Sequence, residues 1–407
     1  MVSGSARSPQ LMRQLNSSAL MRFALRAHAF TAATAMEETG LTRATVIGLC
    51  SDLVDAGWLE KVADSREAGL TRMGRPAHRY RLREDAGTIA ALDAGEHSFT
   101  AIVADLRGSV LARHSLTLDS AVAGRQSRVD TARDMLSRTL EKAGRAPGDL
   151  VLTVVGIPAP VDGDGRSPSG GSGFWPLMNA GFDAGLSGRV VVENDANLAA
   201  LAEQAQQTTP SDNTATLLTG ERFGTGLIVD GRLLHGSRGG AGETRFLDTI
   251  FDDGYASDGI GALARRWARA AVTESDQPSV LRDIDTEHIE ATDVFYAAAA
   301  GDALAHGIIS DLGSRLARVS VVLSSLLDVE RIVVAGAIAR ALDPVVERAR
   351  HVLTTEFPPP VPELAISALG GDVVVRGGIE LALQRIREQP SDFLPRRPAS
   401  APHPHAG

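Results

Sequence analysis

Cysteine is nearly absent from this chain of 407 residues, and Cys50 has no partner with which to form a disulfide within the chain. A single thiol also excludes a zinc site built from a cluster of cysteines. Cys50 follows Leu49 in an apolar helical pattern. We therefore expect it to pack as a small apolar side chain rather than to act as a redox sensor.

Long apolar runs are absent as well. No stretch reaches the ~18 apolar residues that a membrane-spanning helix requires, and no segment has the apolar core of a signal peptide. We therefore expect a soluble, cytoplasmic protein. At 407 residues and 43% apolar content, the chain is too long for one ordinary core, and it predicts two or three folded units.

Positive charge is in deficit, since the formal net charge is −9. This balance argues against a protein that binds nucleic acid over its whole surface. Residues 1–83 nevertheless hold twelve basic against seven acidic side chains, so the acidic excess lies in the remainder. A basic end on an acidic body is typical of a protein that meets phosphates with one face.

The stretch from Ala33 to Lys61 has the pattern helix, turn, helix. A short helical pattern reaches Gly40, a residue that tolerates the left-handed conformation of a tight turn. Thr42 is a good N-cap, and apolar residues then recur at helical spacing as far as Gly57. The polar residues at the start of this second helix would face base edges in a DNA major groove, and they are Thr42, Arg43 and Thr45.

Two short strand patterns follow at 58–62 and 79–82, with an arginine-containing loop between them. This arrangement predicts the wing of a winged helix-turn-helix domain over residues 11–84. The loop adjoins the reading helix, so we expect at least one of its arginines to contact DNA; the alternative is a solvated hairpin tip. These arginines are Arg66, Arg72 and Arg75.

Residues 88–388 alternate between strand and helix patterns, which indicates an α/β domain. The apolar helices expected within 294–327 could supply dimer contacts or could equally be internal core. Residues 1–10 and 390–407 lack apolar periodicity, and we expect a flexible arm and a disordered tail there.

Several segments, taken in order, resemble the ROK family, and in particular its winged-helix repressors of the xylose-repressor and N-acetylglucosamine-repressor type. They are GLTRATVIGLCSDLVDAGWL with its Gly-Arg-Pro wing, LDAGEHSFTAIVADLRG, PAPVDGDGR, ENDANLAALAE, GLIVDGRLLHG, GGAGE and VVAGAIA. The resemblance covers roughly residues 15–385. It implies an actin-like and hexokinase-like ATPase fold, in which two ribonuclease-H-like lobes enclose a cleft.

The resemblance also implies a sugar site at the base of that cleft. Asn194 and Asp195 match positions where the family binds the sugar and, in its kinases, takes a proton from the reacting hydroxyl. Asp195 could also cap the helix that follows it. Glu243 matches an acceptor for a sugar hydroxyl, and Asp253 is a replacement acceptor for a family histidine that is missing here.

Two departures from the family pattern lie in the loops that bind ATP phosphates in its kinases. The Gly-Thr-Gly turn of the kinases is Gly-Glu-Arg at 220–222, and its carboxylate would repel phosphate by about 4 kcal/mol at 4 Å. In the first loop, Glu96 and His97 replace a Gly and a Thr. We therefore expect no tight ATP binding and no enzymatic activity. The loop residues concerned are Asp93, Gly95, Gly220 and Glu221.

A third departure concerns the family's zinc module, a His followed by a tight Cys cluster. Phe246 stands at the place of the His and no cysteine follows, so we predict no metal. The sequence thus predicts a regulator, most simply a repressor of carbohydrate-related genes, that binds double-stranded operator DNA as a homodimer or tetramer and responds to a sugar. The alternatives are a regulator that has lost its sugar and a sugar kinase with an accessory DNA domain.

Overall fold

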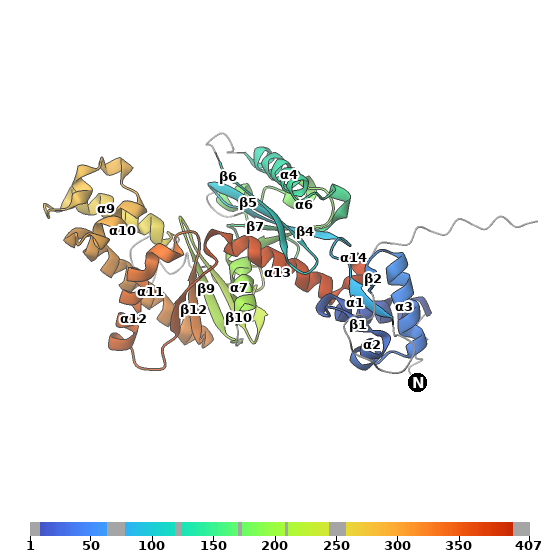
Figure 1. Cartoon of the computed structure of the whole chain (residues 1–407). Helices are drawn as coiled ribbons and strands as arrows, with labels where there is room; N and C mark the ends of the chain where they lie inside the picture. The colour runs from blue at the N-terminus through green and yellow to red at the C-terminus, as the bar shows by residue number, and fades with distance from the viewer. Residues whose placement is uncertain are drawn as a thin grey trace, which may run out of the picture.

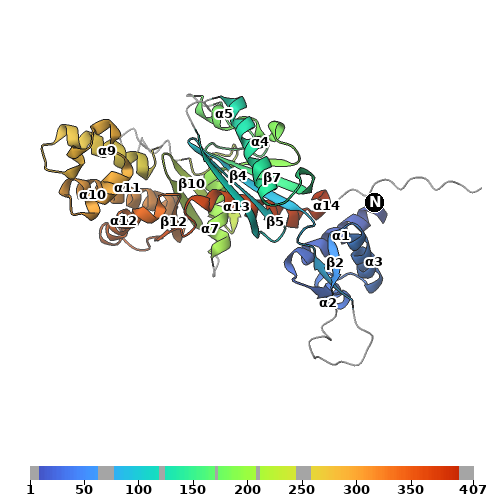
Figure 2. The same cartoon turned by 45° about the horizontal axis from the view of Figure 1, so that its top comes forward.

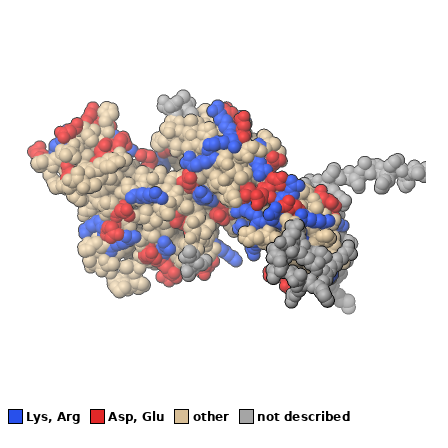
Figure 3. Space-filling view, in the orientation of Figure 1, with Lys and Arg blue, Asp and Glu red and all other residues tan. Residues whose placement is uncertain are grey.

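The computed structural model describes residues 9–62, 78–118, 124–169, 173–207, 211–243 and 258–393. These residues form a small N-terminal domain and two lobes, each built on a five-stranded sheet (Figure 1). Among the described residues, no helix is long and apolar enough to cross a membrane. Basic and acidic side chains are interspersed on the face of the lobes shown in Figure 3.

The N-terminal domain contains the predicted helix-turn-helix. Its helices are α1 (Pro9–Arg26), α2 (Ala32–Thr39) and α3 (Arg43–Asp55). Gly40 ends α2 in the left-handed conformation, with φ of 67°, because its missing Cβ allows that turn. Thr42 begins α3, and its hydroxyl oxygen accepts a hydrogen bond from the backbone N–H of Thr45 at 3.4 Å. Both turn predictions are confirmed.

A three-stranded antiparallel sheet completes this domain. Its order is β1 (Phe30–Thr31), β3 (Arg79–Leu82) and β2 (Leu59–Val62). The sequence did not predict β1, because two residues are too few to show a period. Cys50 lies buried in the domain core as expected, and burial raises the pKa of its thiol to about 12. The thiol therefore stays protonated and unreactive at neutral pH.

The first lobe has the strand order β6-β5-β4-β7-β8, with β4 antiparallel to β5 and parallel to β7. Its helices α4 (Arg125–Lys142), α5 (Phe174–Met178) and α6 (Phe182–Gly185) enclose a buried apolar cluster on one face of that sheet. The strands are β4 (Thr88–Ala94), β5 (Ser98–Asp105), β6 (Val110–Thr117), β7 (Leu150–Ile157) and β8 (Val190–Asn194).

The second lobe has the strand order β11-β10-β9-β12-β13. The strands are β9 (Thr214–Thr219), β10 (Phe223–Val229), β11 (Arg232–Leu233), β12 (Arg331–Ala335) and β13 (Glu363–Ile366). The helices are α9 (Ile260–Glu274), α10 (Ala291–Ala299), α11 (Ala303–Leu327) and α12 (Asp343–Glu356). In α11, Val319 and Leu323 are buried whereas Leu326 is 75% exposed, so most of the apolar face is core.

Two long helices cross between the lobes (Figures 1 and 2). α7 (Asp195–Gln206) follows β8 of the first lobe but packs on β9 and β10 of the second. α13 (Val373–Glu388) follows β13 of the second lobe but packs on β4 and β7 of the first. The two helices also pack closely on each other, since a Cβ on Gly377 would lie 1.7 Å from the carbonyl oxygen of Leu198.

α13 continues toward the N-terminal domain. It is followed by α14 (Pro390–Phe393), which packs on α1, and one apolar cluster joins the domain core to the first lobe and α13. Two expectations need correction. Residues 9 and 10 belong to α1 and not to the predicted flexible arm, and residues 390–393 of the predicted disordered tail form α14, whose Phe393 packs against this cluster.

Candidate functional site

Asn194 and Asp195 lie where β8 ends and α7 begins, at the junction of the lobes. The side-chain oxygen of Asn194 accepts the N–H of Asn197 at 3.0 Å, and its amide nitrogen donates to the carbonyl of Ala159 at 3.1 Å. Asp195 accepts the adjacent N–H of Ala196 at 2.8 Å. The N-cap of α7 is therefore Asn194, so the capping alternative for Asp195 is wrong.

Three carboxylates interact at this junction, and we call them the carboxylate floor: Asp93 at the end of β4, Asp195 and Glu243. Burial, followed by the repulsion of Asp93 and Glu243, raises the pKa of Asp195 well above its usual value. Burial raises the pKa of Asp93 to about 7, against the attraction of Arg128. Near neutral pH the floor can therefore hold a proton and can both donate and accept hydrogen bonds.

Arg128 of α4 holds the loop that follows Asp93. It is 1% exposed, donates to the carbonyl oxygens of Ala94 at 2.7 Å and Gly95 at 2.9 Å, and lies 5.0 Å from the centre of the Phe99 ring. Burial lowers the pKa of Arg128 to about 10, so it remains charged at neutral pH. Sequence reasoning missed this residue, because a charged residue in an amphipathic helix ordinarily predicts a solvated face.

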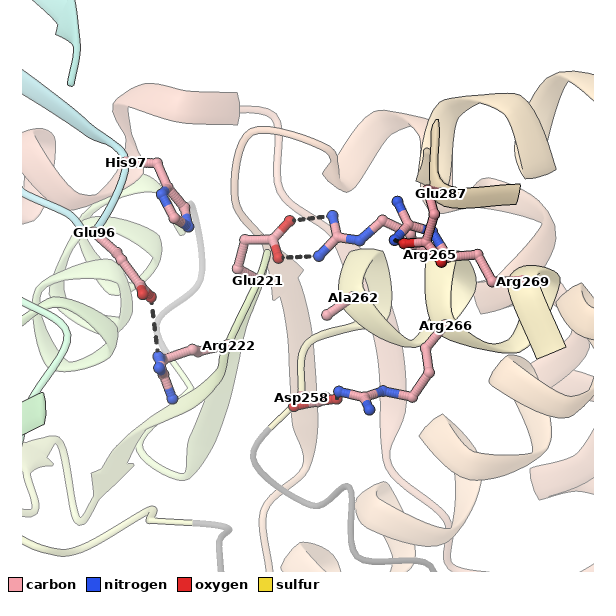
Figure 4. A pocket seen from close by; sticks show the side chains of 10 residues that line it. All are labelled: Glu96, His97, Glu221, Arg222, Asp258, Ala262, Arg265, Arg266, Arg269 and Glu287. Carbon is pink, nitrogen blue, oxygen red and sulfur yellow. Dashed lines mark hydrogen bonds and ion pairs between the residues drawn. The ribbon is translucent and has the colours of Figure 1, made fainter. Parts of the chain in front are cut away.

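A cavity of about 510 Å³ is lined by residues of both lobes, including the next residues of the same loop (Figure 4). We call it the cavity mouth. Its charges balance, since four arginines stand with four carboxylates. These side chains are Arg222, Arg265, Arg266, Arg269, Glu96, Glu221, Asp258 and Glu287.

The two glutamates expected to repel ATP phosphates are paired with arginines. Both carboxylate oxygens of Glu221 accept hydrogen bonds from Arg265, at 2.9 and 2.6 Å, and this contact lowers the pKa of Glu221. Glu96 accepts a hydrogen bond from Nε of Arg222 at 3.2 Å. Each carboxylate is offset by a guanidinium within hydrogen-bond distance, so the expected repulsion of ATP phosphates by unpaired carboxylates does not apply.

A further polar cluster joins the lobes at the start of α7. The buried carboxylate of Glu193 accepts a hydrogen bond from the side chain of Asn197 at 2.9 Å and lies 2.9 Å from Nε2 of His235, which follows β11. Hydrogen bonding to Glu193 raises the pKa of His235. No sequence pattern linked Glu193 to His235, because the two residues lie 42 positions apart in the chain.

The remaining predicted residues lie at the start of α3 and beside Glu221 of the cavity. Thr42 and Arg43 are exposed at the start of α3, and the hydroxyl oxygens of Thr42 and Thr45 are 2.9 Å apart. Gly220 lies in the turn between β9 and β10. Other predictions fall outside the described residues and stay predictions: Asp253, the wing residues Arg66, Arg72 and Arg75, and the missing zinc ligand at Phe246.

Two α/β lobes joined by crossing helices, with a carboxylate cluster at their junction, define an actin-like, hexokinase-like fold, as predicted. The chain belongs to the ROK family, whose family model matches residues 89–385.

Relatives of two kinds are similar to it. A glucokinase of Halalkalibacterium halodurans is 30% identical over 278 residues, which cover 62% of this chain and 82% of the glucokinase. The DNA-binding transcriptional dual regulator NagC of Escherichia coli is 24% identical over 345 residues, which cover 81% of this chain and 82% of NagC. A xylose repressor of Caldicellulosiruptor bescii is 22% identical over 286 residues, covering 69% of this chain and 70% of the repressor.

Solved structures agree with the fold. A ROK family transcriptional regulator, a homologue of the E. coli MLC protein, superimposes with a TM-score of 0.70 at 19% identity, covering 94% of this chain and 98% of the other. A ROK family glucokinase from Streptomyces griseus, in complex with glucose and AMPPNP, gives a TM-score of 0.59 at 25% identity, covering 73% of this chain and 100% of the glucokinase.

The expectation that the chain is not an enzyme is wrong in the light of these similarities. The relative with 30% identity is a glucokinase, and this identity exceeds the 24% shared with NagC. The paired glutamates of the cavity mouth remove the physical objection as well.

Proposed function

We propose that the protein is a transcriptional regulator, acting as a repressor of carbohydrate-related genes, whose ROK domain binds a sugar or a sugar derivative. It would bind double-stranded operator DNA as a homodimer, with one helix-turn-helix on each half-site. The observation that carries the proposal is the combination, in one chain, of a helix-turn-helix with a ROK domain. NagC, a regulator by name, aligns with 81% of the chain.

The exposed face of α3 supports DNA reading. Arg43 and Ile47 lie four residues apart on that face, and Ile47 is 44% exposed although it is apolar. A guanidinium matches the two acceptors of guanine in the major groove, and an aliphatic side chain matches the methyl group of thymine. Both would therefore find partners on base edges, while Arg66, Arg72 and Arg75 would contact phosphates.

The path of α13 supports coupling between sugar and DNA. This helix packs along α7, which begins at Asp195, and it also contacts α1 of the N-terminal domain. A sugar that binds one arrangement of the lobes better than another would shift the end of α13 against α1. The spacing of the two reading helices in a dimer would change with it.

Substitution of Arg43 tests the DNA assignment. Arg43→Ala is expected to weaken operator binding by about 10- to 100-fold and to relax base preference, because one bidentate base contact contributes about 1–3 kcal/mol. Fluorescence anisotropy with a footprinted operator and a scrambled duplex measures both. Arg72→Ala and Arg75→Ala should mainly reduce affinity and its salt dependence.

Arg138→Ala, on the exposed side of α4, is the matched control and should leave binding unchanged. If the Arg43 variant binds both duplexes as the parent protein does, the assignment is contradicted.

Sugar phosphorylation is a second candidate activity, and the position of Asp195 favours it. Its raised pKa and its place at the junction of the lobes suit a general base that takes a proton from a sugar hydroxyl. An ADP-release assay with magnesium-ATP and glucose, xylose or N-acetylglucosamine tests this activity. Turnover that is lost in Asp195→Asn and kept in Asp183→Asn, an exposed residue of α6, would support it.

A thermal-shift panel with the same sugars, without nucleotide, tests the sugar part separately. Binding of glucose, xylose or N-acetylglucosamine should raise the melting temperature. No shift with any sugar would contradict that part and leave a DNA-binding protein that responds to another signal.

A further inference from the structure

Arg222 crosses from one lobe to the other. It lies in the turn between β9 and β10 of the second lobe, and its Nε donates to Glu96 of the first lobe at 3.2 Å (Figure 4). Its guanidinium carbon also lies 3.6 Å from the centre of the ring of Phe174, the first residue of α5 in the first lobe. Moving the lobes apart must therefore break an ion pair and a cation–π contact together.

The first-lobe partners are held in place and cannot simply follow Arg222. Arg128 is fully buried and binds the carbonyl oxygens of Ala94 and Gly95, directly before Glu96. Phe174 packs against the buried cluster of the first lobe. A displacement of the second lobe would thus be resisted at this point.

Neighbouring arginines of the cavity mouth make a different kind of contact. Arg265 pairs with Glu221, and Arg266 lies 2.8 Å from Asp258, so these pairs connect elements of the second lobe with each other. They would move with that lobe as a unit. Arg266 therefore serves as a control for Arg222, because it carries the same charge in the same cavity and pairs with Asp258 of the second lobe.

We propose that Arg222 is a latch that holds the two lobes together through Glu96 and Phe174. The lobes can move apart and open the cavity mouth only when Arg222 releases both contacts. The strength of these contacts therefore sets the ratio of closed to open molecules. An exposed ion pair and a cation–π contact are each modest, and together they should change this ratio about 5-fold or more. The latch is a property of the ROK domain itself; only its effect on operator affinity rests on the proposed function.

Distance measurements between spin labels test the latch on the full chain. Labels at Ser137→Cys on α4 and Glu274→Cys on α9, both exposed, report the separation of the lobes, and the buried Cys50 should remain unlabelled. Arg222→Ala and Glu96→Gln should shift the distribution toward longer distances. The charge reversal Arg222→Glu with Glu96→Arg should restore part of the short-distance population, and Arg266→Ala should leave it unchanged.

High salt should shift the distance distribution of the parent protein toward longer distances, as Glu96→Gln does, because counterions screen an exposed ion pair. A distribution for Arg222→Ala that superimposes on that of the parent would overturn the latch, as would an equal shift in Arg266→Ala. Operator binding, measured on the same variants, separates the two proposals. A shifted distribution with no DNA binding by any protein would keep the latch and reject the regulator.

Discussion

The carboxylate floor and the cavity mouth are both rich in acidic residues, yet their acids behave in opposite ways. At the floor, burial and neighbouring carboxylates raise the pKa of Asp195. At the mouth, Arg265 lowers the pKa of Glu221. The difference teaches that the pKa of a carboxylate in this protein is decided by its burial and by the charges beside it, rather than by its place in a motif.

The largest expected effect concerns the function proposed for the floor. Asp195→Asn should weaken sugar binding by at least about 10-fold, because the amide nitrogen of Asn cannot accept a hydrogen bond and a buried polar group left without a partner costs about 1–3 kcal/mol. The same change should raise the melting temperature at pH 8, since it removes a carboxylate whose ionisation the fold disfavours. Calorimetric titration with glucose and a thermal melt measure the two effects. A variant that is less stable than the parent and binds glucose with full affinity would contradict the difference drawn between the floor and the cavity mouth.

Removal of the cation at the mouth should have a smaller effect. Arg265→Ala should lower the free energy of unfolding by about 1 kcal/mol, because Glu221 loses a bidentate partner whose attraction solvent partly screens. Urea denaturation at pH 7 measures it. In the background of Glu221→Gln, the same substitution should lower the free energy of unfolding clearly less. Equal losses in the two backgrounds would show that the Arg265–Glu221 pair does not contribute this stability.

At the floor, Asp93→Asn should stabilise the protein by at least about 1 kcal/mol above pH 7. The pKa of about 7 in the folded state lies above the ordinary 3.8, so the fold penalises the ionised form. This penalty is absent below about pH 4, grows between pH 4 and 7, and is complete above pH 7. Urea denaturation across this range should show the two proteins converging at low pH; a constant difference would argue against titration of Asp93.

The smallest effect is expected at the half-exposed His235. Its pKa is raised by Glu193, so its protonated form adds stability below the unfolded pKa of about 6.5, and this gain disappears as pH rises through the folded pKa. His235→Gln should therefore cost about 0.5 kcal/mol at pH 5.5 and less at pH 9. Thermal melts at the two pH values measure the difference, and a larger cost at pH 9 would have the wrong sign.

Local chemistry made much of the fold predictable. Gly40 and Thr42 mark the turn and the helix start that they adopt, because each residue acts through its own backbone or its nearest neighbours. The strands of both lobes could also be placed from their apolar runs.

The failures concern partners that are far away in sequence. Glu221 was judged without Arg265, which lies 44 residues further on. The latch residues Glu96 and Arg222 lie 126 residues apart. A sequence pattern states which side chains occur, but the sheet order decides which of them meet.

The exchange of α7 and α13 between the lobes has a consequence for the integrity of the molecule. Each sheet is covered by a helix whose preceding strand belongs to the other sheet. Cutting the chain between the lobes would leave both halves with a bare apolar surface, so neither is expected to survive as a separate domain. Changes that reshape one half must therefore remain compatible with the other, and the pair must evolve and fold as a single unit.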